Sequence, residues 1–377
     1  MRILYSAIDQ VVPGTKGGST HVTAVAEGLA ALGHEMHVLV TPGDGPFPRG
    51  TIHWIPMSPP FGINQLRWMR SGAVAGLLER LKPDAIMERY YNFGGEAILH
   101  AQAFNARSVL EVNAPVIDHP GSTKALLDRA LIVRPFERRR ERLCAAADII
   151  VTPSAAILPL NTPGSKVLEV EWGADTDRFR PDAPGQVPFA PPPGIVAVFA
   201  GAFRSWHGAI HLVRAIKRLR ERGTRDITAL FIGEGPELPA VRSEAASLDN
   251  VVFTGAVPHE LMPAALARAH IGVAPFDLGA HKPLSLGFYW SPLKMFEYMA
   301  AGLPVVAPAA ARIPALVSDG REGLLYDPND PGALARTLEQ LADPQLRARL
   351  GAGARKRAVR EYSWRAHCEA LARRLAR

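Results

Sequence analysis

Short apolar runs rich in β-branched residues alternate with helix-like segments along most of this chain. Clear examples are ILYSA at 3–7, VAVFA at 196–200 and ALFI at 229–232, each followed by a glycine-containing turn. Strands joined by crossover helices form parallel sheets. A proline-rich stretch at 181–193 interrupts the alternation and indicates a linker. The sequence therefore predicts an α/β protein with two parallel sheets.

The first half is expected to hold five strands and three helices. The expected strands are at 1–7, 36–40, 85–87, 108–112 and 149–152. The expected helices are at 20–32, 73–81 and 126–147, the last of them broken near Pro135 because proline disrupts a helix interior. After the linker the same rhythm restarts, with a helix expected at 207–222 and mostly helical structure over 331–377.

Composition narrows the class of protein. A chain of 377 residues is longer than a domain with a single hydrophobic core usually is, so two domains are expected. No apolar run approaches the roughly 20 residues that span a bilayer. The N-terminus lacks a signal-peptide layout, and Cys144 and Cys368 form no disulfide or metal pattern, so a cytoplasmic location is expected. The net charge of +7 suits an anionic partner such as nucleic acid, a phospholipid surface or a nucleotide sugar.

The most informative segment is 291–308, SPLKMFEYMAAGLPVVAP. Pro292 suits the first turn of a helix, Gly302 can end it in the left-handed conformation, and the next run predicts a buried strand. Lys294 and Glu297 share a helix face near the positive N-terminus. Free amides and Lys294 could bind a diphosphate, while Glu297 could accept hydrogen bonds from ribose hydroxyls. A solvated carboxylate is the plainer alternative for Glu297.

Glycine turns follow several expected strands, at the edge where parallel sheets bind ligands. In the first half, residues 17–20 (GGST) open a helix, so amides around Gly18 can approach an anion. In the second half, residues 201–208 (GAFRSWHG) place Arg204 and His207 at the corresponding position. A single glycine turn is common in any α/β protein, and a surface arginine is ordinary.

Two further turns strengthen this pattern. Residues 233–235 and 255–257 follow the next two expected strands of the second half. Because the carboxyl ends of parallel strands share one sheet edge, these turns are expected to lie together. The set predicts a phosphate-binding site.

In this order and spacing, the motifs resemble glycosyltransferase family 4 over nearly the full length. The matching segments are GGSTHV, EWGADTDRFRP, VFAGAFRSWHG, FIGEGPELPAV, VVFTGAVPHELM, SPLKMFEYMAAGLPVVA and DGREGLLYDPND. The resemblance implies the GT-B fold: two facing Rossmann-like domains with an interdomain cleft. It implies a retaining transferase that moves a sugar from a nucleotide diphosphate to an acceptor hydroxyl. The implied domains are an acceptor domain at 1–180, a donor domain at 194–360, and a closing helix at 361–377 that packs back on the first.

The resemblance also assigns roles in the donor site. Glu297 matches the second glutamate of the family's E-x7-E pattern, which holds the donor ribose. The first glutamate falls at Tyr289, so the FYWSPLK segment is expected to hold the donor through amides around Ser291 and Leu293, together with Lys294.

The family's basic pair is altered as well. Its arginine falls at Ala202 and its lysine at His207, which leaves Arg204 as the expected phosphate cation. His207 is expected to donate a hydrogen bond when neutral, or to help neutralise the leaving diphosphate when protonated. The other donor-binding residues implied are Gly18, Gly208, Gly233 and Val257, the last through its backbone beside the nucleobase.

Glu111 matches a position where many relatives carry a histidine near the transferred sugar. It is expected to bond the sugar or orient the acceptor, and the predicted catalytic residues are Glu111, Arg204 and Lys294. Glu88 and Arg89 could line the acceptor side, with ordinary ion pairing equally expected. No Asp-x-Asp pattern occurs in a suitable loop, so neither a metal nor a cofactor is expected besides the nucleotide-sugar co-substrate.

The acceptor stays open among a glycan, a lipid and a small molecule. Residues 126–143 (LLDRALIVRPFERRRERL) form a basic amphipathic stretch that suits an anionic inner-membrane surface, although packing on the sheet is the plainer interpretation. A nucleotide-sugar 2-epimerase, which shares the architecture, is the main alternative function. A nucleic-acid-binding protein would rest on charge alone and lacks interleaved aromatics, so no nucleic-acid partner is expected.

Overall fold

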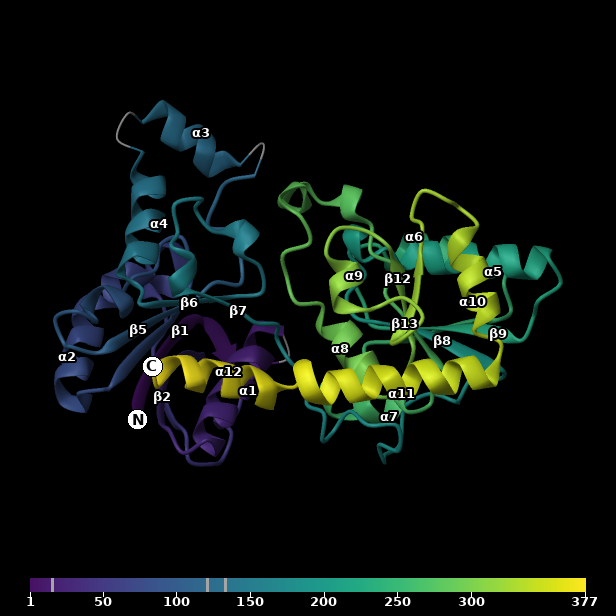
Figure 1. Ribbon diagram of the computed structural model, residues 1–377, viewed down its shortest axis with the longest axis horizontal. Helices are drawn as coiled ribbons and strands as arrows, with labels where there is room; N and C mark the ends of the chain where they lie inside the picture. Colours follow the sequence, from purple (N-terminus) through teal and green to yellow (C-terminus); the bar gives the residue numbers. More distant parts are fainter. Residues whose placement is uncertain (15–16, 120–121, 132–133) are drawn as a thin grey trace. The chain divides into compact units, whose positions relative to one another are not determined.

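The computed structural model describes residues 1–14, 17–119, 122–131 and 134–377. The chain forms two compact units. The first contains Met1–Trp172, Tyr289–Ser291 and Trp364–Arg377, and the second contains Gly173–Phe288 and Pro292–Ser363. Each unit is built on one parallel sheet, so the predicted pair of α/β domains is confirmed (Figure 1).

The first unit has a seven-stranded parallel sheet in the order β3-β2-β1-β4-β5-β6-β7. Its strands are β1 (Arg2–Val12), β2 (Glu35–Pro42), β3 (His53–Pro56), β4 (Ala85–Arg89), β5 (Arg107–Glu111), β6 (Ile149–Thr152) and β7 (Val167–Glu169). Its helices are α1 (Gly17–Ala31), α2 (Ser71–Leu81), α3 (Thr123–Ala130), α4 (Pro135–Ala146) and α12 (Trp364–Leu375). Helices α1 and α12 cover one face of the sheet, where Val25 and Leu371 are buried, and Leu78 of α2 is buried on the other.

The second unit has a six-stranded parallel sheet in the order β10-β9-β8-β11-β12-β13. Its strands are β8 (Ile195–Ala200), β9 (Ile227–Ile232), β10 (Val251–Gly255), β11 (Ile271–Val273), β12 (Val305–Pro308) and β13 (Gly323–Tyr326). Its helices are α5 (Ala209–Glu221), α6 (Leu238–Glu244), α7 (Met262–Leu266), α8 (Leu293–Ala300), α9 (Ile313–Leu316), α10 (Ala333–Gln340) and α11 (Pro344–Glu361). The strand order reverses between β8 and β11, the switch point at which such sheets bind ligands.

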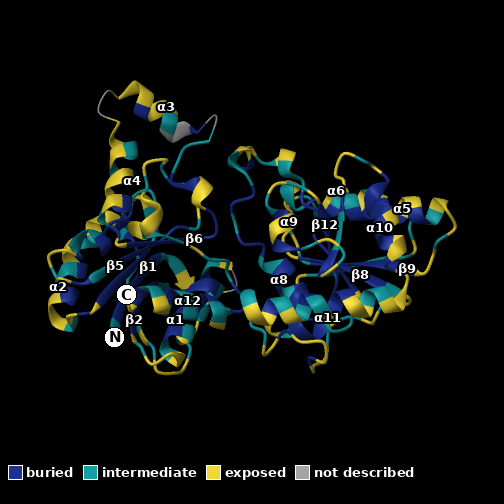
Figure 2. Ribbon diagram, in the orientation of Figure 1, coloured by how far each residue is buried: buried dark blue, intermediate teal, exposed yellow. Residues whose placement is uncertain are grey.

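Both sheets are buried between their helices, as Figure 2 shows by the dark strands at the centre of each unit. The continuous apolar runs of the sequence follow from this burial, because a parallel strand needs apolar side chains on both faces. Within the described residues, no helix is both long and apolar enough to cross a membrane.

Several local predictions hold and others fail. The helix expected at 126–147 is broken as predicted: α3 ends at Ala130 and α4 begins at Pro135, where a missing amide hydrogen costs nothing. Gly302 ends α8 with a φ of 75°. Pro292, however, precedes α8 with a ψ of 80° and is not in its first turn. The sequence analysis did not foresee β3, β7 and β13, which have only three or four residues each.

The units also divide the chain at other residues than 180 and 360. Residues 173–180 belong to the second unit because they are bonded to it: Arg355 donates to the carbonyls of Phe179 and Thr176 at 2.7 and 2.9 Å. Ala174 forms a bridge to Ser363. The chain then returns to the first unit at Trp364, where α12 packs against α1.

Candidate active site

Close backbone packing shapes the carboxyl edge of the second sheet. Gly201 and Gly233 follow β8 and β9 with φ of 129° and 130°, a region that only glycine adopts readily. A β-carbon on Gly233 would lie 2.1 Å from the Gly201 carbonyl oxygen. A β-carbon on Gly208, before α5, would lie 1.8 Å from the carbonyl oxygen of Pro275. Because Gly208 and Gly233 lack a β-carbon, the loops after β8, β9 and β11 can pack closely at this edge. Both glycines were predicted site residues.

Lys294 lies beneath these turns, in the first turn of α8. Its Nζ atom is buried and has no hydrogen-bond partner among the described residues. The atom lies 4.2 Å from the ring centroid of Phe199 and 5.6 Å from that of Phe276, and a β-carbon on Gly201 would come within 3.2 Å of it. Burial lowers the pKa of Lys294 to about 7, although the Glu297 carboxylate opposes this shift. An anion at the glycine turns would supply the counter-charge that this ammonium lacks.

His207 lies in the same loop and is neutral. Burial and the nearby Lys294 lower the pKa of His207 to about 3. Its Nδ1 is 2.6 Å from the Ala202 carbonyl oxygen, which can only accept, so Nδ1 carries the proton and Nε2 is the acceptor. In this structure His207 is therefore neither the cation nor the free donor that the sequence suggested. Arg204 is exposed, with its guanidinium carbon 5.9 Å from the Trp206 ring centroid.

Glu297 lies one helical turn after Lys294 and is half-buried. Its Oε1 is 3.4 Å from Nε2 of His259, and this hydrogen bond raises the pKa of His259. His259 follows the loop that contains Val257, after β10, so that loop and Glu297 are close. Leu293 is the first residue of α8.

Three predicted site residues lie in the first unit. The Ser291 hydroxyl donates to Glu171 at 2.6 Å and accepts from the Trp172 amide at 2.9 Å, so the side chain already has partners there. Gly18 lies in the first turn of α1, where a β-carbon would clash with the side chain of Gln10. The third residue, Glu111, belongs to a buried polar network.

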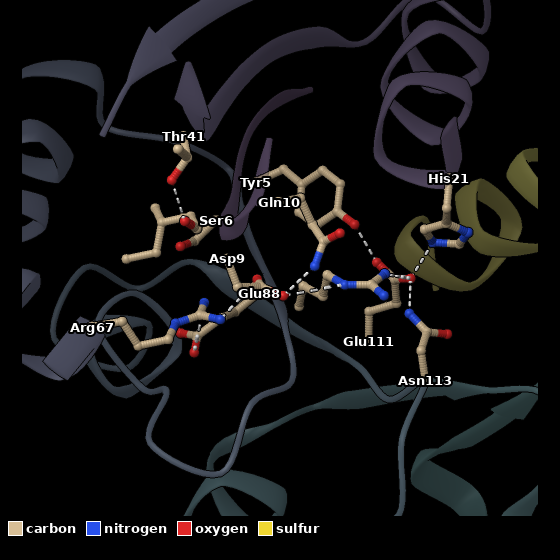
Figure 3. Close-up of polar contacts among 12 residues, drawn as sticks. Tyr5, Ser6, Asp9, Gln10, His21, Thr41, Arg67, Glu88, Glu111 and Asn113 are labelled. Carbon is tan, nitrogen blue, oxygen red and sulfur yellow. Dashed lines mark hydrogen bonds and ion pairs between the residues drawn. The ribbon is translucent and has the colours of Figure 1, made fainter. Parts of the chain in front are cut away.

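Glu111 ends β5 and is almost completely buried. Its polar contacts are drawn in Figure 3. Its carboxylate contacts the Tyr5 hydroxyl, His21 and the Asn113 amide, and lies 3.5 Å from Nη1 of Arg89. Burial opposes ionisation, but His21, Arg89 and Tyr5 together hold the pKa of Glu111 well below its usual range. Glu111 is thus an ionised carboxylate whose orientation is fixed by its neighbours, as expected of a group that positions a ligand.

A second cluster continues from this one across β1 and β4. Arg67 is fully buried and donates to Asp9 at 2.9 Å and to Glu96 at 3.0 Å. Glu88 accepts the amides of Ala97 and Ile98 at 3.0 and 2.8 Å, and burial beside the Glu96 charge raises the pKa of Glu88 to about 7.

The two clusters meet at Arg89, whose guanidinium lies 3.6 Å from Asp9 and 3.5 Å from Glu111. Sequence reasoning had singled out Glu88, Arg89 and Glu111 but missed Asp9 and Arg67. Asp9 directly follows the first apolar run, which was a usable signal. Arg67 lies in an irregular stretch of 3-10 helix (Asn64–Arg70) that has no periodic pattern.

Two protein-family models match this chain. Residues 194–343 match a family model described as glycosyl transferases group 1, and residues 15–158 match one described as Glycosyltransferase Family 4. Together the two ranges include both units and most of the chain. The chain belongs to glycosyltransferase family 4. It is an enzyme that transfers a sugar from a nucleotide-sugar donor, and the matches do not favour the epimerase alternative.

Individual relatives agree with this assignment. The family 4 enzyme is 30% identical over 218 residues to a GDP-mannose-dependent alpha-(1-6)-phosphatidylinositol monomannoside mannosyltransferase of Mycolicibacterium smegmatis, covering 56% of each chain. It is 28% identical to a phosphatidyl-myo-inositol mannosyltransferase of the same organism, covering 94% of this chain and 87% of the relative. Sucrose-phosphate synthase from Thermosynechococcus elongatus has the same fold, with a TM-score of 0.76, 20% identity, and coverage of 100% of this chain and 98% of that one.

Proposed function

We propose that this glycosyltransferase moves mannose from GDP-mannose, with retention of anomeric configuration, to a hydroxyl of an inositol-containing glycolipid. The observation that carries the donor assignment is the buried Lys294 ammonium without a partner, beside glycine turns at a sheet edge. The identity of the donor and acceptor is supported by the names of the related mannosyltransferases. Retention is supported by the family resemblance.

In the proposed mechanism the second unit stabilises the leaving diphosphate. Cleavage of the bond to the sugar places negative charge on the diphosphate, and a cation in a dry site is worth most there. A bound diphosphate would restore the proton of Lys294 and raise its pKa. Because Nζ is covered in this structure, the Lys294 side chain or the Gly201 turn must shift to make this contact.

Glu297 would hold the ribose of the same donor. A carboxylate accepts two hydroxyl hydrogen bonds, and the His259 contact fixes the orientation of the Glu297 side chain. Arg204, exposed in the neighbouring loop, would complete the charge around the phosphates. No step in this proposal requires a metal.

In the first unit, the polar network would bind the acceptor. Four carboxylates (Asp9, Glu88, Glu96 and Glu111) are matched by two arginines, Arg67 and Arg89. Because the carboxylates outnumber the arginines, the network favours a neutral polar ligand group over one that brings a further negative charge. A polyol ring such as inositol has this chemistry.

We further propose that the first unit contacts an anionic lipid surface through α3. Leu126, Leu127 and Leu131 are 57%, 50% and 46% exposed, and Arg129 and Arg134 near them are exposed too. Large apolar side chains flanked by arginines suit the interface of an anionic bilayer. Sedimentation with vesicles that contain phosphatidylinositol tests this: binding should fall strongly in L126S/L127S, and equal binding of the variant would contradict it.

Two measurements test the enzymatic proposal. Titration of GDP-mannose, UDP-glucose and ADP-glucose against the enzyme should show tightest binding of GDP-mannose; preference for another base would overturn the donor assignment. Proton NMR of the product formed early in the reaction should show the α-anomer expected for retention, and an initial β-anomer would overturn that part.

A further inference from the structure

A cavity of about 490 Å³ lies within the second unit, apart from the residues assigned to the donor. It opens between α5 and α10, which lie side by side in Figure 1. Two arginines and a histidine of α5 line one wall: His211, Arg214 and Arg218. Tyr326 and Leu334 contribute an apolar wall.

The two arginines have no direct hydrogen-bonding partner. In the part of the chain that the structure describes, neither the Arg214 nor the Arg218 guanidinium makes a hydrogen bond or an ion pair. Spaced four apart on α5, they lie on the same side of the helix. Both can therefore reach one ligand in the cavity.

The acidic residues of the cavity are already bonded. Asp330 accepts hydrogen bonds from Arg336 and, at 2.8 Å, from the Gly332 amide. These contacts, together with the nearby positive charge of Arg218, lower the pKa of Asp330. Asp277 accepts from the Gly279 amide at 3.0 Å and lies 3.4 Å from His211. The positive charge available to a ligand is thus on the α5 wall.

The cavity is connected to the loop at 201–208, which contains Arg204 and His207 of the proposed donor site. The Asp277 amide donates to the Trp206 carbonyl at 3.0 Å, and the rings of Trp206 and His281 are stacked with centroids 4.1 Å apart. Phe276, which lines the cavity, is also the ring whose centroid lies 5.6 Å from Nζ of Lys294. Movement of residues 276–277 on ligand binding would therefore change the position of the loop at 204–207.

We propose that this cavity is an effector site for a small phosphomonoester, whose phosphate is bound by Arg214 and Arg218 and whose remainder contacts Tyr326 and Leu334. Two guanidinium forks match the oxygens of one phosphate, and the cavity has room for a sugar-sized group. Occupation of the site changes donor affinity through residues 276–277. The binding step is independent of the proposed function, and only the effect on the donor rests on it.

The test uses the full enzyme with its donor site saturated by GDP, so that added phosphate compounds cannot compete there. Calorimetric titration with mannose 6-phosphate, glycerol 3-phosphate and inorganic phosphate should show one further site for at least one phosphomonoester. Its dissociation constant should rise at least tenfold in R214Q/R218Q. The matched control K217Q/R225Q removes the same charge from exposed residues that do not line the cavity, and should bind as the wild type does.

No binding by any of the three probes, or equal binding by both double variants, would overturn the proposal. If GDP does not bind, the same titrations are run without it. The R214Q/R218Q comparison then tests the effector site alone, and the absence of GDP binding contradicts only the donor assignment.

Discussion

The Nζ atom of Lys294 lies 4.2 Å from the centre of the Phe199 ring and has no hydrogen-bond partner among the described residues. The aromatic face offsets only part of the cost of burying this charge. The unpaired charge of Lys294 destabilises the empty enzyme, and a bound anion would remove this cost by pairing with it. The Lys294 site can therefore be tested by measurements of folding stability as well as of activity.

Stability should depend on pH through Lys294. Its pKa is about 7 in the folded enzyme, against an ordinary value of 10.5, so the unfolded chain binds more protons between these pH values. Folding stability supplied by this group therefore rises from pH 7 to pH 10, by on the order of 4 kcal/mol. K294M should lack this rise and be more stable than the wild type at pH 7, as measured by urea unfolding. Parallel pH curves for the two proteins would contradict the buried charge.

Glu297→Ala should weaken GDP binding about tenfold to a hundredfold, because the ribose hydroxyls lose their acceptor. Inorganic pyrophosphate has no ribose, so its affinity should not change. Calorimetry with both ligands separates the two contacts. An equal loss for pyrophosphate would show that Glu297 acts on the phosphate site or on folding instead.

Gly233→Ala should destabilise the second unit by about 3 kcal/mol or more, because its β-carbon would lie 2.1 Å from the Gly201 carbonyl oxygen at a φ of 130°. Gly223 also has a positive φ, 87°, but a β-carbon there meets nothing within 4 Å. Gly223→Ala should therefore cost only about 1–2 kcal/mol. Thermal unfolding compares the pair, and equal losses would refute the close approach of the two turns.

Arg67→Met should destabilise the first unit by about 3–5 kcal/mol, because the buried Glu96 would lose its guanidinium partner and Asp9 would keep only Arg89. Arg80→Met on the exposed side of α2 is the matched control and should change stability by less than about 0.5 kcal/mol. Addition of Glu96→Gln to Arg67→Met should recover part of the loss. A single variant as stable as the control would show that the network carries no net charge pairing.

The sequence predicted those features that are determined locally. The end of α8 at Gly302 was foreseeable because a left-handed residue favours glycine, and the break before α4 because proline lacks an amide hydrogen. The Lys294–Glu297 spacing placed both residues on one helix without knowledge of the fold. The burial of Lys294 could not be foreseen, since Phe199 and Phe276 reach it from other elements.

The polar network of the first unit was largely hidden from the sequence for the same reason. Arg67 meets Glu96 across 29 positions and Asp9 across 58, and its own segment has no helical period. The residue types of Arg67 and Asp9 do not indicate burial either, since arginine and aspartate are usually exposed. Short strands such as β3 and β13 were missed because four residues carry too little pattern to be recognised.

Proton uptake on nucleotide binding tests the central role of Lys294 most directly. At pH 8.5 most of the empty enzyme has a neutral Lys294, so binding of the diphosphate should recharge it. Calorimetric titration of GDP in two buffers of different ionisation enthalpy should give an uptake approaching one proton for the wild type. K294M should bind about a hundredfold more weakly, a loss of about 2.7 kcal/mol, without that uptake. Equal affinity and equal proton uptake in both proteins would contradict the account.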